Sequence, residues 1–428
     1  MPDGSTTQAQ SSRNMAARDK AYSTPLKDFQ VADPELFRSD TLWPWFERLR
    51  AEDPVHLTEQ GPNGRYWSVT RHADIIAVDS HHGVYSSSSE LGGITLQDAV
   101  EPNASTSFIG LDPPMHDAQR RAVMPMFSTE SMAQLEPLIR ERAGKILDEL
   151  PVGETFDFVD KVAVELTSQM LATLFDYPFE LRRNLPKLSD MILSGPEITG
   201  AGEMTPEQMM ALQEKFMSIL TPFTLMWEDR KAKPPQHDLI SMLSHCDATA
   251  KPTPEEYFGN IVLLIVAGSD TTRHSITGGL LALNQNPDEY AKLRADPGLI
   301  QSMVPDIIRW QSPVAYMRRT ALADTELGGK TIKKGERVVM WYVSGNRDET
   351  AIEDANVFRI DRERPRQHVG FGFGIHRCVG NRLAEMQLKV MWEEILKRFK
   401  HIEVVGEPRR MNNSFVKGNE GMDVRIVG

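Results

Sequence analysis

Cys378 is one of only two cysteines in the chain, and it lies in the glycine-rich stretch HVGFGFGIHRCVGNRLAE. A cysteine can bind zinc, act as a nucleophile, pack as an inert thiol or ligate iron. No second group of ligands with zinc spacing accompanies Cys378, which argues against a zinc site. His376 could activate a nucleophile if the segment were a strand, but the surrounding glycines indicate a turn.

The glycines around Cys378 separate the two remaining roles. A free cysteine is commonly an inert buried thiol, but that role leaves the glycines unexplained. A thiolate on iron needs backbone N–H groups directed at its sulfur, because a buried anion must be hydrogen-bonded. Gly372 and Gly374 allow the tight turn that directs these N–H groups. A helix that starts near Cys378 would bring its positive N-terminal end to the sulfur. Gly380 has no side chain and so leaves space for a flat ligand.

His368 and His376 flank the turn and could hydrogen-bond carboxylates on the edge of that ligand. A thiolate-ligated haem accounts for all of these features. The stretch FGFGIHRCVG, which runs from Phe371 to Gly380, resembles the haem-binding signature of the cytochrome P450 superfamily in every fixed position. The resemblance extends in order and spacing from about residue 30 to the C-terminus.

The resemblance implies a mainly α fold with smaller β sheets, in which a long central helix crosses a buried haem b and the cysteine loop lies on the opposite face. It also implies residues that hold the haem propionates. In LDPPMHDAQRR these are His116 and Arg120, and in RRTALADTELGG the residue is Arg319, with Arg318 the second choice.

The segment AGSDTT resembles the oxygen-activating motif of the family's central helix. Gly268 could otherwise be an incidental helix glycine, which costs about 1 kcal/mol relative to alanine. Under the resemblance, Ala267 and Gly268 open the helix to dioxygen, Thr271 hydrogen-bonds the oxygen being activated, and Asp270 relays protons from solvent. The chain is therefore expected to be an O2-dependent monooxygenase.

The elements that must position these residues can be read from periodicity. TPEEYFGNIVLLIVAGSDTTRHSITGGLLALNQNP predicts one long buried helix, with Thr253 and Glu256 as a capping box and Asn286-Pro287 as its end. Further helices are predicted at 131–150, 158–175 and 381–399, and strands at 66–70, 335–343 and 401–406. Residues 1–25 are expected to be a flexible polar tail and 26–428 a single domain.

The sequence departs from the family pattern at one place. The glutamate of the family's Glu-x-x-Arg pair is replaced by Asp306, followed by Arg309, and the downstream arginine of that network is matched by Arg362. A carboxylate and a guanidinium at i and i+3 can still pair on a helix. Aspartate is one methylene shorter, which predicts a weaker network but an intact fold.

Apolar residues predict the kind of substrate. Four segments resemble the bacterial alkane and fatty-acid terminal hydroxylases: "MRRTALADTELGG", "VMWYVSGNRD", "RQHVGFGFGIHRCVGNRLAE" and "NNSFVKG". Steroid side chains and terpenoids, camphor-like ones included, stay open as substrates. A methionine-rich segment over the site is expected to be either a lid or ordinary core: Met191, Met204, Met209, Met210, Met217 and Met226. The expected pocket walls are Phe108, Ile109, Val266, Val314, Ala315, Tyr316, Met317, Phe415 and Val416.

Composition and missing motifs bear on partners. A net charge of -12 argues against nucleic acid, no apolar run is long enough for a membrane anchor, and two cysteines suit a cytoplasmic monomer. No flavin, NAD or Cys-rich motif occurs, so a separate redox partner is required. The family resemblance implies that this partner is a ferredoxin served by a reductase. Four basic residues near the cysteine are either ordinary solvated charges or a basic docking surface for the redox partner: Arg121, Arg377, Arg382 and Lys389. A non-catalytic haem sensor or carrier and a peroxide-driven enzyme are the rival functions.

Overall fold

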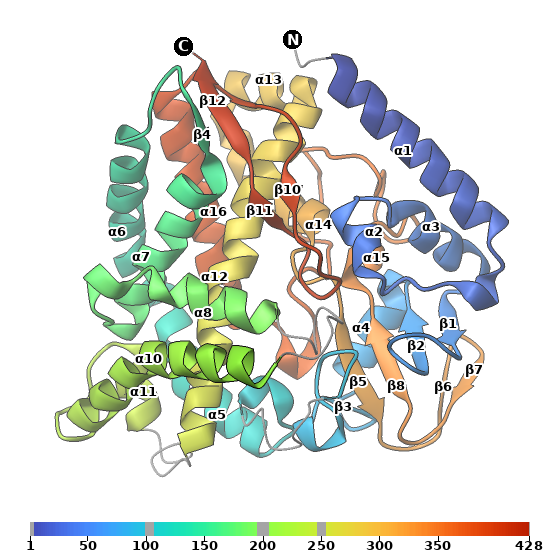
Figure 1. Cartoon of the computed structure of the whole chain (residues 1–428), viewed down its shortest axis with the longest axis horizontal. Coiled ribbons are helices and arrows are strands. Elements are labelled where there is room, and N and C mark those ends of the chain that lie inside the picture. Colours follow the sequence, from blue (N-terminus) through green and yellow to red (C-terminus); the bar gives the residue numbers. More distant parts are fainter. Residues whose placement is uncertain (1–3, 99–106, 195–204, 246–253, 428) are drawn as a thin grey trace.

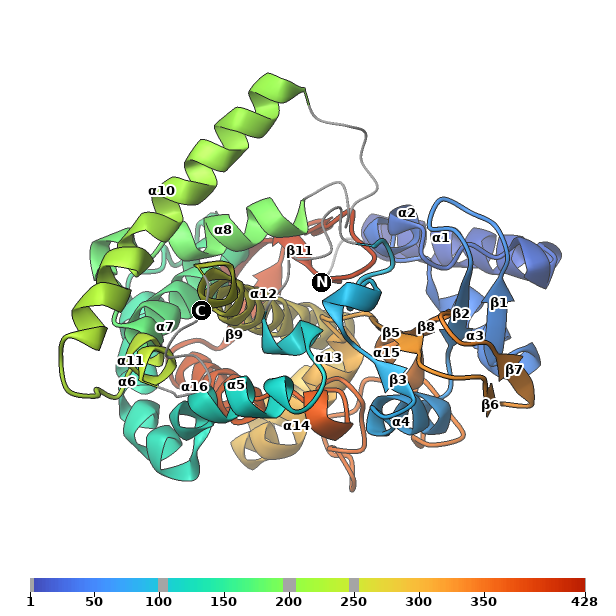
Figure 2. The same ribbon diagram turned by 90° about the horizontal axis from the view of Figure 1, so that it is seen from below.

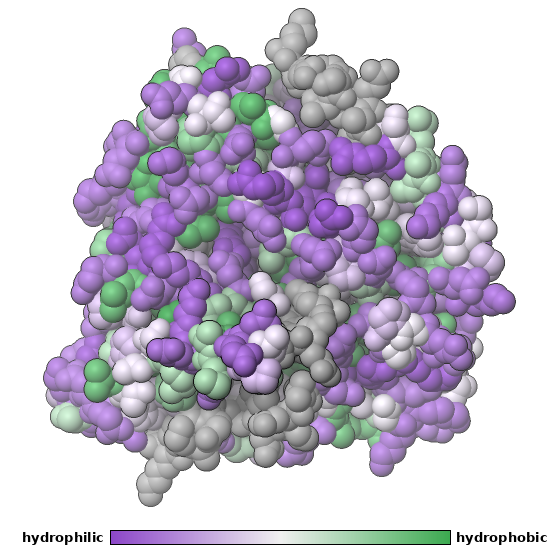
Figure 3. Space-filling view, in the orientation of Figure 1, coloured by the Kyte–Doolittle hydropathy of each residue, from purple (hydrophilic) through white to green (hydrophobic). Residues whose placement is uncertain are grey.

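The computed structural model describes residues 4–98, 107–194, 205–245 and 254–427. Most of the helices gather on one side of the molecule, and the largest sheet lies on the other side with the N-terminal helices, while further short strands lie among the helices (Figures 1 and 2). The fold is therefore mainly α with small sheets, as the sequence predicts. The face in Figure 3 is mostly hydrophilic, with hydrophobic residues scattered over it. Among the described residues, no helix combines the length and apolar character needed to cross a membrane.

The helices supply most of the structure. In chain order they are α1 (Gly4–Ser23), α2 (Pro34–Arg38), α3 (Trp43–Glu52), α4 (His72–Ser80), α5 (Met115–Val123), α6 (Thr129–Asp148), α7 (Glu165–Phe175), α8 (Asn184–Leu193), α10 (Pro206–Lys231), α11 (Leu239–Ser244), α12 (Pro254–Gln285), α13 (Pro287–Ala295), α14 (Ile300–Gln311), α15 (Tyr342–Gly345) and α16 (Asn381–Arg398). The largest buried apolar cluster joins α6, α7, α12, α14 and α16.

The strands of the described residues form four small sheets. They are β1 (Val55–Thr58), β2 (Tyr66–Val69), β3 (Tyr85–Ser86), β4 (Thr155–Asp157), β5 (Met317–Ala321), β6 (Thr325–Leu327), β7 (Lys330–Ile332), β8 (Arg337–Met340), β9 (His401–Val404), β10 (Arg409–Arg410), β11 (Asn419–Gly421) and β12 (Asp423–Val427). The largest sheet has the order β1-β2-β8-β5-β3, and its β2 and β8 are parallel. Strands from both ends of the chain therefore lie in one sheet.

The long helix α12 crosses the helical part of the molecule (Figure 1). Its middle is buried because it packs against α7, α8, α14 and α16. Asn286 ends the helix and Pro287 begins α13, as predicted. Thr253 of the predicted capping box lies outside the described residues.

The N-terminal segment differs from its prediction. Gly4–Ser23 form the helix α1, which packs against α3. Arg18 makes a 2.8 Å ion pair with Glu47, and Arg48 donates a 2.8 Å hydrogen bond to the carbonyl oxygen of Ala21, which is fully buried. The prediction of a flexible tail was wrong for this helix because its contacts with α3, rather than its own weak apolar pattern, hold it in place.

Asp306 of α14 lies in the core with no exposed surface. Its Oδ1 accepts hydrogen bonds from Arg309 Nε at 2.6 Å and Arg362 Nε at 2.7 Å, and its Oδ2 accepts one from the backbone N–H of Arg359 at 3.0 Å. The aspartate therefore reaches both arginines through one oxygen. The expectation that its shorter side chain weakens this network is not met in the geometry.

Candidate functional site

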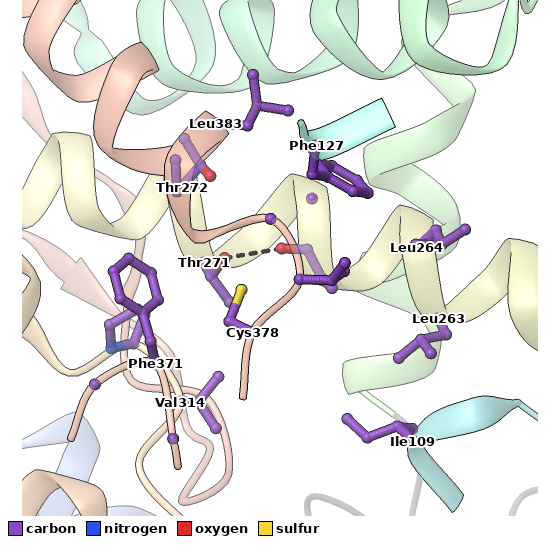
Figure 4. A pocket seen from close by; sticks show the side chains of 18 of the residues that line it. Ile109, Phe127, Leu263, Leu264, Thr271, Thr272, Val314, Phe371, Cys378 and Leu383 are labelled. Carbon is purple, nitrogen blue, oxygen red and sulfur yellow. Dashed lines mark hydrogen bonds between the residues drawn. The ribbon is translucent and has the colours of Figure 1, made fainter. Parts of the chain in front are cut away.

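One large cavity lies between α12, the cysteine loop and β5 (Figure 4). Counting its mouth, it holds about 1440 Å³ of empty space. A pocket for one small ligand usually measures about 300–1,000 Å³, so this cavity has room for a large prosthetic group and a substrate together. Cys378 and Thr271 both line it.

The loop from Phe371 to Gly380 needs glycine at two positions. Gly372 and Gly374 have φ angles of +66° and +63°, in the left-handed region that other residues rarely adopt. A Cβ on Gly374 would also lie 2.2 Å from the carbonyl oxygen of Asp79 in α4. The backbone N–H of Cys378 donates a 2.9 Å hydrogen bond to the carbonyl oxygen of Phe371, which closes the turn.

Cys378 has accessible surface because it faces the cavity. Burial raises the pKa of its thiol, while a hydrogen bond from the Gly380 backbone and the nearby charges of Arg120 and Arg377 act in the opposite direction. A Cβ added to Gly380 would meet only Phe127, at 3.7 Å. The glycine thus leaves cavity space beside the sulfur, as a flat ligand on that sulfur requires.

Four residues of the α12 motif lie on the cavity wall: Ala267, Gly268, Thr271 and Thr272. Thr271 Oγ1 donates a 2.8 Å hydrogen bond to the Ala267 carbonyl oxygen (Figure 4). A Cβ on Gly268 would lie 2.8 Å from Leu171, so this glycine admits α7 at close range. The helix is continuous through the motif, so the predicted opening at Ala267 and Gly268 is not present.

Asp270 does not line the cavity. It is completely buried, accepts a 2.5 Å hydrogen bond from Ser189 of α8 and pairs with Arg273 at 2.8 Å. Arg273 pairs in turn with Asp190 at 2.6 Å, and that side chain is half exposed. Burial raises the pKa of Asp270 to about 6 against the opposing effect of Arg273. Arg273 therefore connects this buried carboxyl to a half-exposed carboxylate.

Basic side chains gather at one rim of the cavity. Arg120 and Arg319 line it, and Arg319 Nη2 donates a 2.8 Å hydrogen bond to Asp79. Met317 and Arg319 are two positions apart on β5 and so share a face, whereas Arg318 points away to Asp98 at 2.6 Å. The strand alternation explains why Arg319, and not Arg318, reaches the cavity.

Two histidines lie near this rim, and each has a buried ring nitrogen without a hydrogen-bond partner. His376 lines the cavity and shares a 2.8 Å hydrogen bond with Ser87, while its Nδ1 is unpartnered. His116 lies behind it with ring centroids 4.3 Å apart; its Nδ1 bonds Asp117 and its Nε2 is unpartnered. Burial lowers the pKa of His376 to about 2, so this imidazole is neutral.

His368 does not lie where the sequence placed it. It is outside the cavity, its Nδ1 accepts a 3.1 Å hydrogen bond from the Gly370 backbone, and its ring lies against Phe371. Burial and the charge of Arg309 lower the pKa of its imidazole to about 3. Because His368 does not line the cavity, it is not positioned to bond the carboxylate of a ligand there, and the prediction is corrected on this point.

Four of the nine predicted wall residues line the cavity, and five do not. Phe108, Ile109, Val314 and Met317 line the cavity. Five predicted wall residues instead belong to a neighbouring apolar core cluster, where they are buried or packed against it: Val266, Ala315, Tyr316, Phe415 and Val416. The sequence alone could not distinguish the residues that line the cavity from those buried in the core cluster. Both sets are apolar, and some of their members are neighbours in the chain, such as Val314 and Ala315.

Several wall residues were missed by the sequence. They come from helices that pack around the cavity: Phe127, Thr167, Met170, Leu171, Leu174, Leu239, Leu263 and Leu264. One feature of the sequence could have indicated some of them. The middle of α12 is apolar on every side, so its residues must face either other helices or a ligand cavity. None of the described methionines of the predicted lid lines the cavity, and Met209, Met210 and Met217 are exposed. Met204 lies outside the described residues.

The four residues of the predicted basic docking surface differ in their surroundings. Arg121, Arg377 and Arg382 are exposed and form no ion pair within the described part of the chain. Lys389 lies 3.5 Å from Glu136 and 3.8 Å from Glu393, which offset its charge. The positive surface beside the cysteine loop is therefore carried by the three arginines.

The donor set fits a haem. A sulfur ligand faces the cavity, space remains beside it at Gly380, and the two rim arginines and the two imidazoles with unpartnered nitrogens can hold carboxylates. The remaining walls are mostly aliphatic and aromatic, which suits a macrocycle and an apolar substrate.

Comparison with known proteins gives a consistent result. The family description "Cytochrome P450" matches residues 69–425. The solved structure of CYP153D17 from Sphingomonas sp. PAMC 26605 is similar with 43% identity and a TM-score of 0.87, covering 94% of this chain and 100% of that one. Linalool 8-monooxygenase of Pseudomonas putida is 35% identical over 93% of this chain and 98% of its own. Steroid C26-monooxygenase of Mycolicibacterium smegmatis is 32% identical over 89% of each.

Proposed function

This chain belongs to the cytochrome P450 family, and we propose that it hydroxylates the terminal methyl group of a medium-chain alkane or fatty acid. Family membership makes it a monooxygenase that uses haem b and O2. The substrate, the roles of individual residues, the redox partner, the monomeric state and the cytoplasmic location belong to the proposal.

One observation carries the proposal: Cys378 and Thr271 line the same cavity, whose other walls are largely aliphatic. Among the described wall residues, the fully charged side chains are Arg120 and Arg319, both at the rim. A buried charge on the substrate would lack an oppositely charged partner deeper in the cavity. This arrangement favours an alkyl chain as the part of the substrate that enters.

Haem, when bound, supplies the iron at which O2 is reduced and its O–O bond is cleaved. The protein groups have separate tasks. Cys378 provides the thiolate ligand, and Arg120, Arg319 and His376 hold the propionates. Thr271 can turn its hydroxyl from the Ala267 carbonyl towards the cavity and donate a hydrogen bond there. Asp270 holds a proton at its carboxyl oxygen and passes it inward from the Asp190 side.

Regioselectivity is the harder requirement, because a terminal C–H bond is stronger than its neighbours. A shape that admits only the end of a chain must therefore choose the carbon. Four segments of this sequence resemble terminal hydroxylases, and the names of two relatives support the same preference. Carbon 26 of a steroid and carbon 8 of linalool are both at the end of an alkyl chain. A steroid side chain or a terpenoid is therefore the second candidate substrate.

Electrons come from a ferredoxin and its reductase in this proposal. The exposed arginines beside the cysteine loop, Arg121, Arg377 and Arg382, suit an acidic partner that approaches the thiolate side. A non-catalytic haem carrier would not need a threonine on the cavity wall and a buried carboxyl beside it. A peroxide-driven enzyme would turn over without the ferredoxin system.

The test is a titration of the holoprotein with straight-chain alkanes, fatty acids, linalool and a steroid, followed by optical spectroscopy. An alkane should convert low-spin to high-spin haem, and turnover with ferredoxin and reductase should give the primary alcohol by mass spectrometry. Val314→Phe should shorten the preferred chain, whereas Val152→Phe, at an exposed position, should not. A subterminal alcohol, or a spin shift with steroid alone, would overturn the proposed substrate.

A further inference from the structure

A second cavity, separate from the haem cavity, lies where α12, α14 and the β10–β11 hairpin meet the start of α3. It shares no lining residue with the first and has about 570 Å³ of empty space including its mouth. Its elements meet in the middle of the view in Figure 1. Nothing in the proposed monooxygenase reaction uses this cavity.

Arg347 is the unusual residue in this cavity. It is 6% exposed, and its guanidinium lies between two indoles, with Cζ 3.4 Å from the Trp310 ring centroid and 4.3 Å from that of Trp43. Within the described chain, its guanidinium makes no hydrogen bond or ion pair, and its Nε is buried without a partner. Burial lowers the pKa of Arg347 well below its usual value.

This geometry leaves one direction for a partner. Two indole rings lie close to the guanidinium carbon, so the N–H groups of Arg347 must find acceptors where the rings do not cover them. An arginine keeps its charge in a protein. Water at that edge could satisfy the hydrogen bonds but would not neutralise the buried charge, whose cost is large when it is unpaired.

The neighbouring charges do not neutralise Arg347 either. Lys417 lines the same cavity, donates a 3.0 Å hydrogen bond to the Gln311 carbonyl oxygen, and has its pKa lowered by burial to about 8. Arg410 also lines it, at 3.7 Å from Asp40 and 3.4 Å from Glu407. Asp40 is the only carboxylate among the described lining residues, so the wall carries more positive than negative charge.

We propose that this cavity binds one small inorganic oxyanion of the phosphate or sulfate type. The in-plane N–H groups of Arg347 bind two of its oxygens, a geometry for which a guanidinium is suited, and the Lys417 ammonium binds from the hairpin side. The anion joins the segment from Asp40 to Trp43 to the β10–β11 hairpin and α14. Its role is to stabilise the packing of the N-terminal and C-terminal parts of the chain.

The experiment is isothermal titration calorimetry on the holoprotein after dialysis into a buffer free of phosphate, sulfate and halide. Phosphate, sulfate and chloride are titrated separately at constant ionic strength. Phosphate or sulfate should bind saturably at one site. Lys417→Gln should weaken that binding at least tenfold, whereas Lys400→Gln, which removes an exposed lysine elsewhere, should leave it unchanged.

Three outcomes would overturn the proposal. If neither oxyanion binds saturably, the cavity holds water, and if only chloride binds, the site does not select an oxyanion. If the Lys417→Gln variant binds the oxyanion with unchanged affinity, the anion lies elsewhere. Arg347→Lys keeps the charge but loses the planar donors, so it should also bind at least tenfold more weakly. If that variant does not fold, the Lys417→Gln arm still decides. An anomalous selenate peak between Arg347 and Lys417 in a crystal would locate the site directly.

Discussion

Asp306 and Arg362 are 56 positions apart in the chain and are joined by a 2.7 Å hydrogen bond between Asp306 Oδ1 and Arg362 Nε. The same oxygen accepts from Arg309, whose Nη1 and Nη2 donate to the carbonyl oxygens of Asn346, Ala355 and Val357. One carboxylate thus compensates two buried guanidiniums and fixes the chain that leads towards the cysteine loop.

Asp306→Ala should lower the free energy of unfolding by about 3–5 kcal/mol, because it leaves two buried positive charges without compensation. Haem content should fall with it, while Asp306→Glu should retain both. The measurement is denaturant unfolding together with the haem-to-protein ratio. Asp361→Ala is the control, since this half-exposed carboxylate pairs with Lys292 at the surface and should cost at most about 1 kcal/mol. An Asp306→Ala variant as stable as the control would contradict the network's role.

Cys378→His should remove the thiolate signature. The reduced, carbon monoxide-bound wild type should show the strongly red-shifted Soret band of a thiolate-ligated haem, and the variant should not. Haem that remains bound in the variant should show the spectrum of an imidazole complex. Persistence of the red-shifted band would mean that Cys378 is not the ligand.

Thr271→Ala should uncouple electron use from product formation. Without the hydroxyl on the cavity wall, protons reach the oxygen being activated less selectively, so peroxide should be released while reductant consumption continues. Thr271→Ser keeps the hydroxyl and should restore coupling. The readout is the ratio of product to reductant consumed, and an unchanged ratio in the alanine variant would refute this role.

Asp270 should make stability depend on pH in a particular direction. Its pKa is raised from 3.8 to about 6 by burial, so the folded protein holds this proton more tightly than the unfolded chain does. Its contribution to stability should therefore decrease as pH rises from about 4 to 6, by about 2–3 kcal/mol in all. Asp270→Asn should remove that decrease.

The check is the difference in unfolding free energy between wild type and Asp270→Asn, measured across that pH range. Asp361→Asn is the control of opposite sign, since Lys292 lowers the pKa of Asp361. A difference for Asp270 that rises with pH would show that its pairing with Arg273 outweighs its burial.

Arg382→Gln should raise the KM for an acidic ferredoxin and leave the spectrum of the substrate complex unchanged. The effect should shrink at high salt, because an exposed charge contributes through screened electrostatics. Lys400→Gln, which removes an exposed lysine at the end of α16, should leave the KM unchanged. Equal effects of the two variants would place the dock elsewhere.

Sequence predicted the residues whose roles depend on local spacing. The cysteine loop could be recognised because its glycines and cysteine stand at fixed intervals, and α12 because an apolar helix of that length has to be buried. His368 was misplaced because proximity to Cys378 in the chain does not say on which side of Phe371 a ring lies. Tyr316 and Phe415 were misplaced for a related reason: apolar character predicts burial but not whether the neighbour is a cavity or another side chain.

The mixed sheet has a consequence for how the protein is made. β2 pairs in parallel with β8, Ser87 bonds His376 across 289 positions of chain, and Asp79 accepts a 2.7 Å hydrogen bond from the backbone of Phe373. A nascent polypeptide still lacking its last segment has no cysteine loop for Asp79 and Ser87 to hold, and no complete sheet beneath it. The haem site can therefore form only after the segment that carries β8 and the cysteine loop has been synthesised, and until then β2, Asp79 and Ser87 lack these partners.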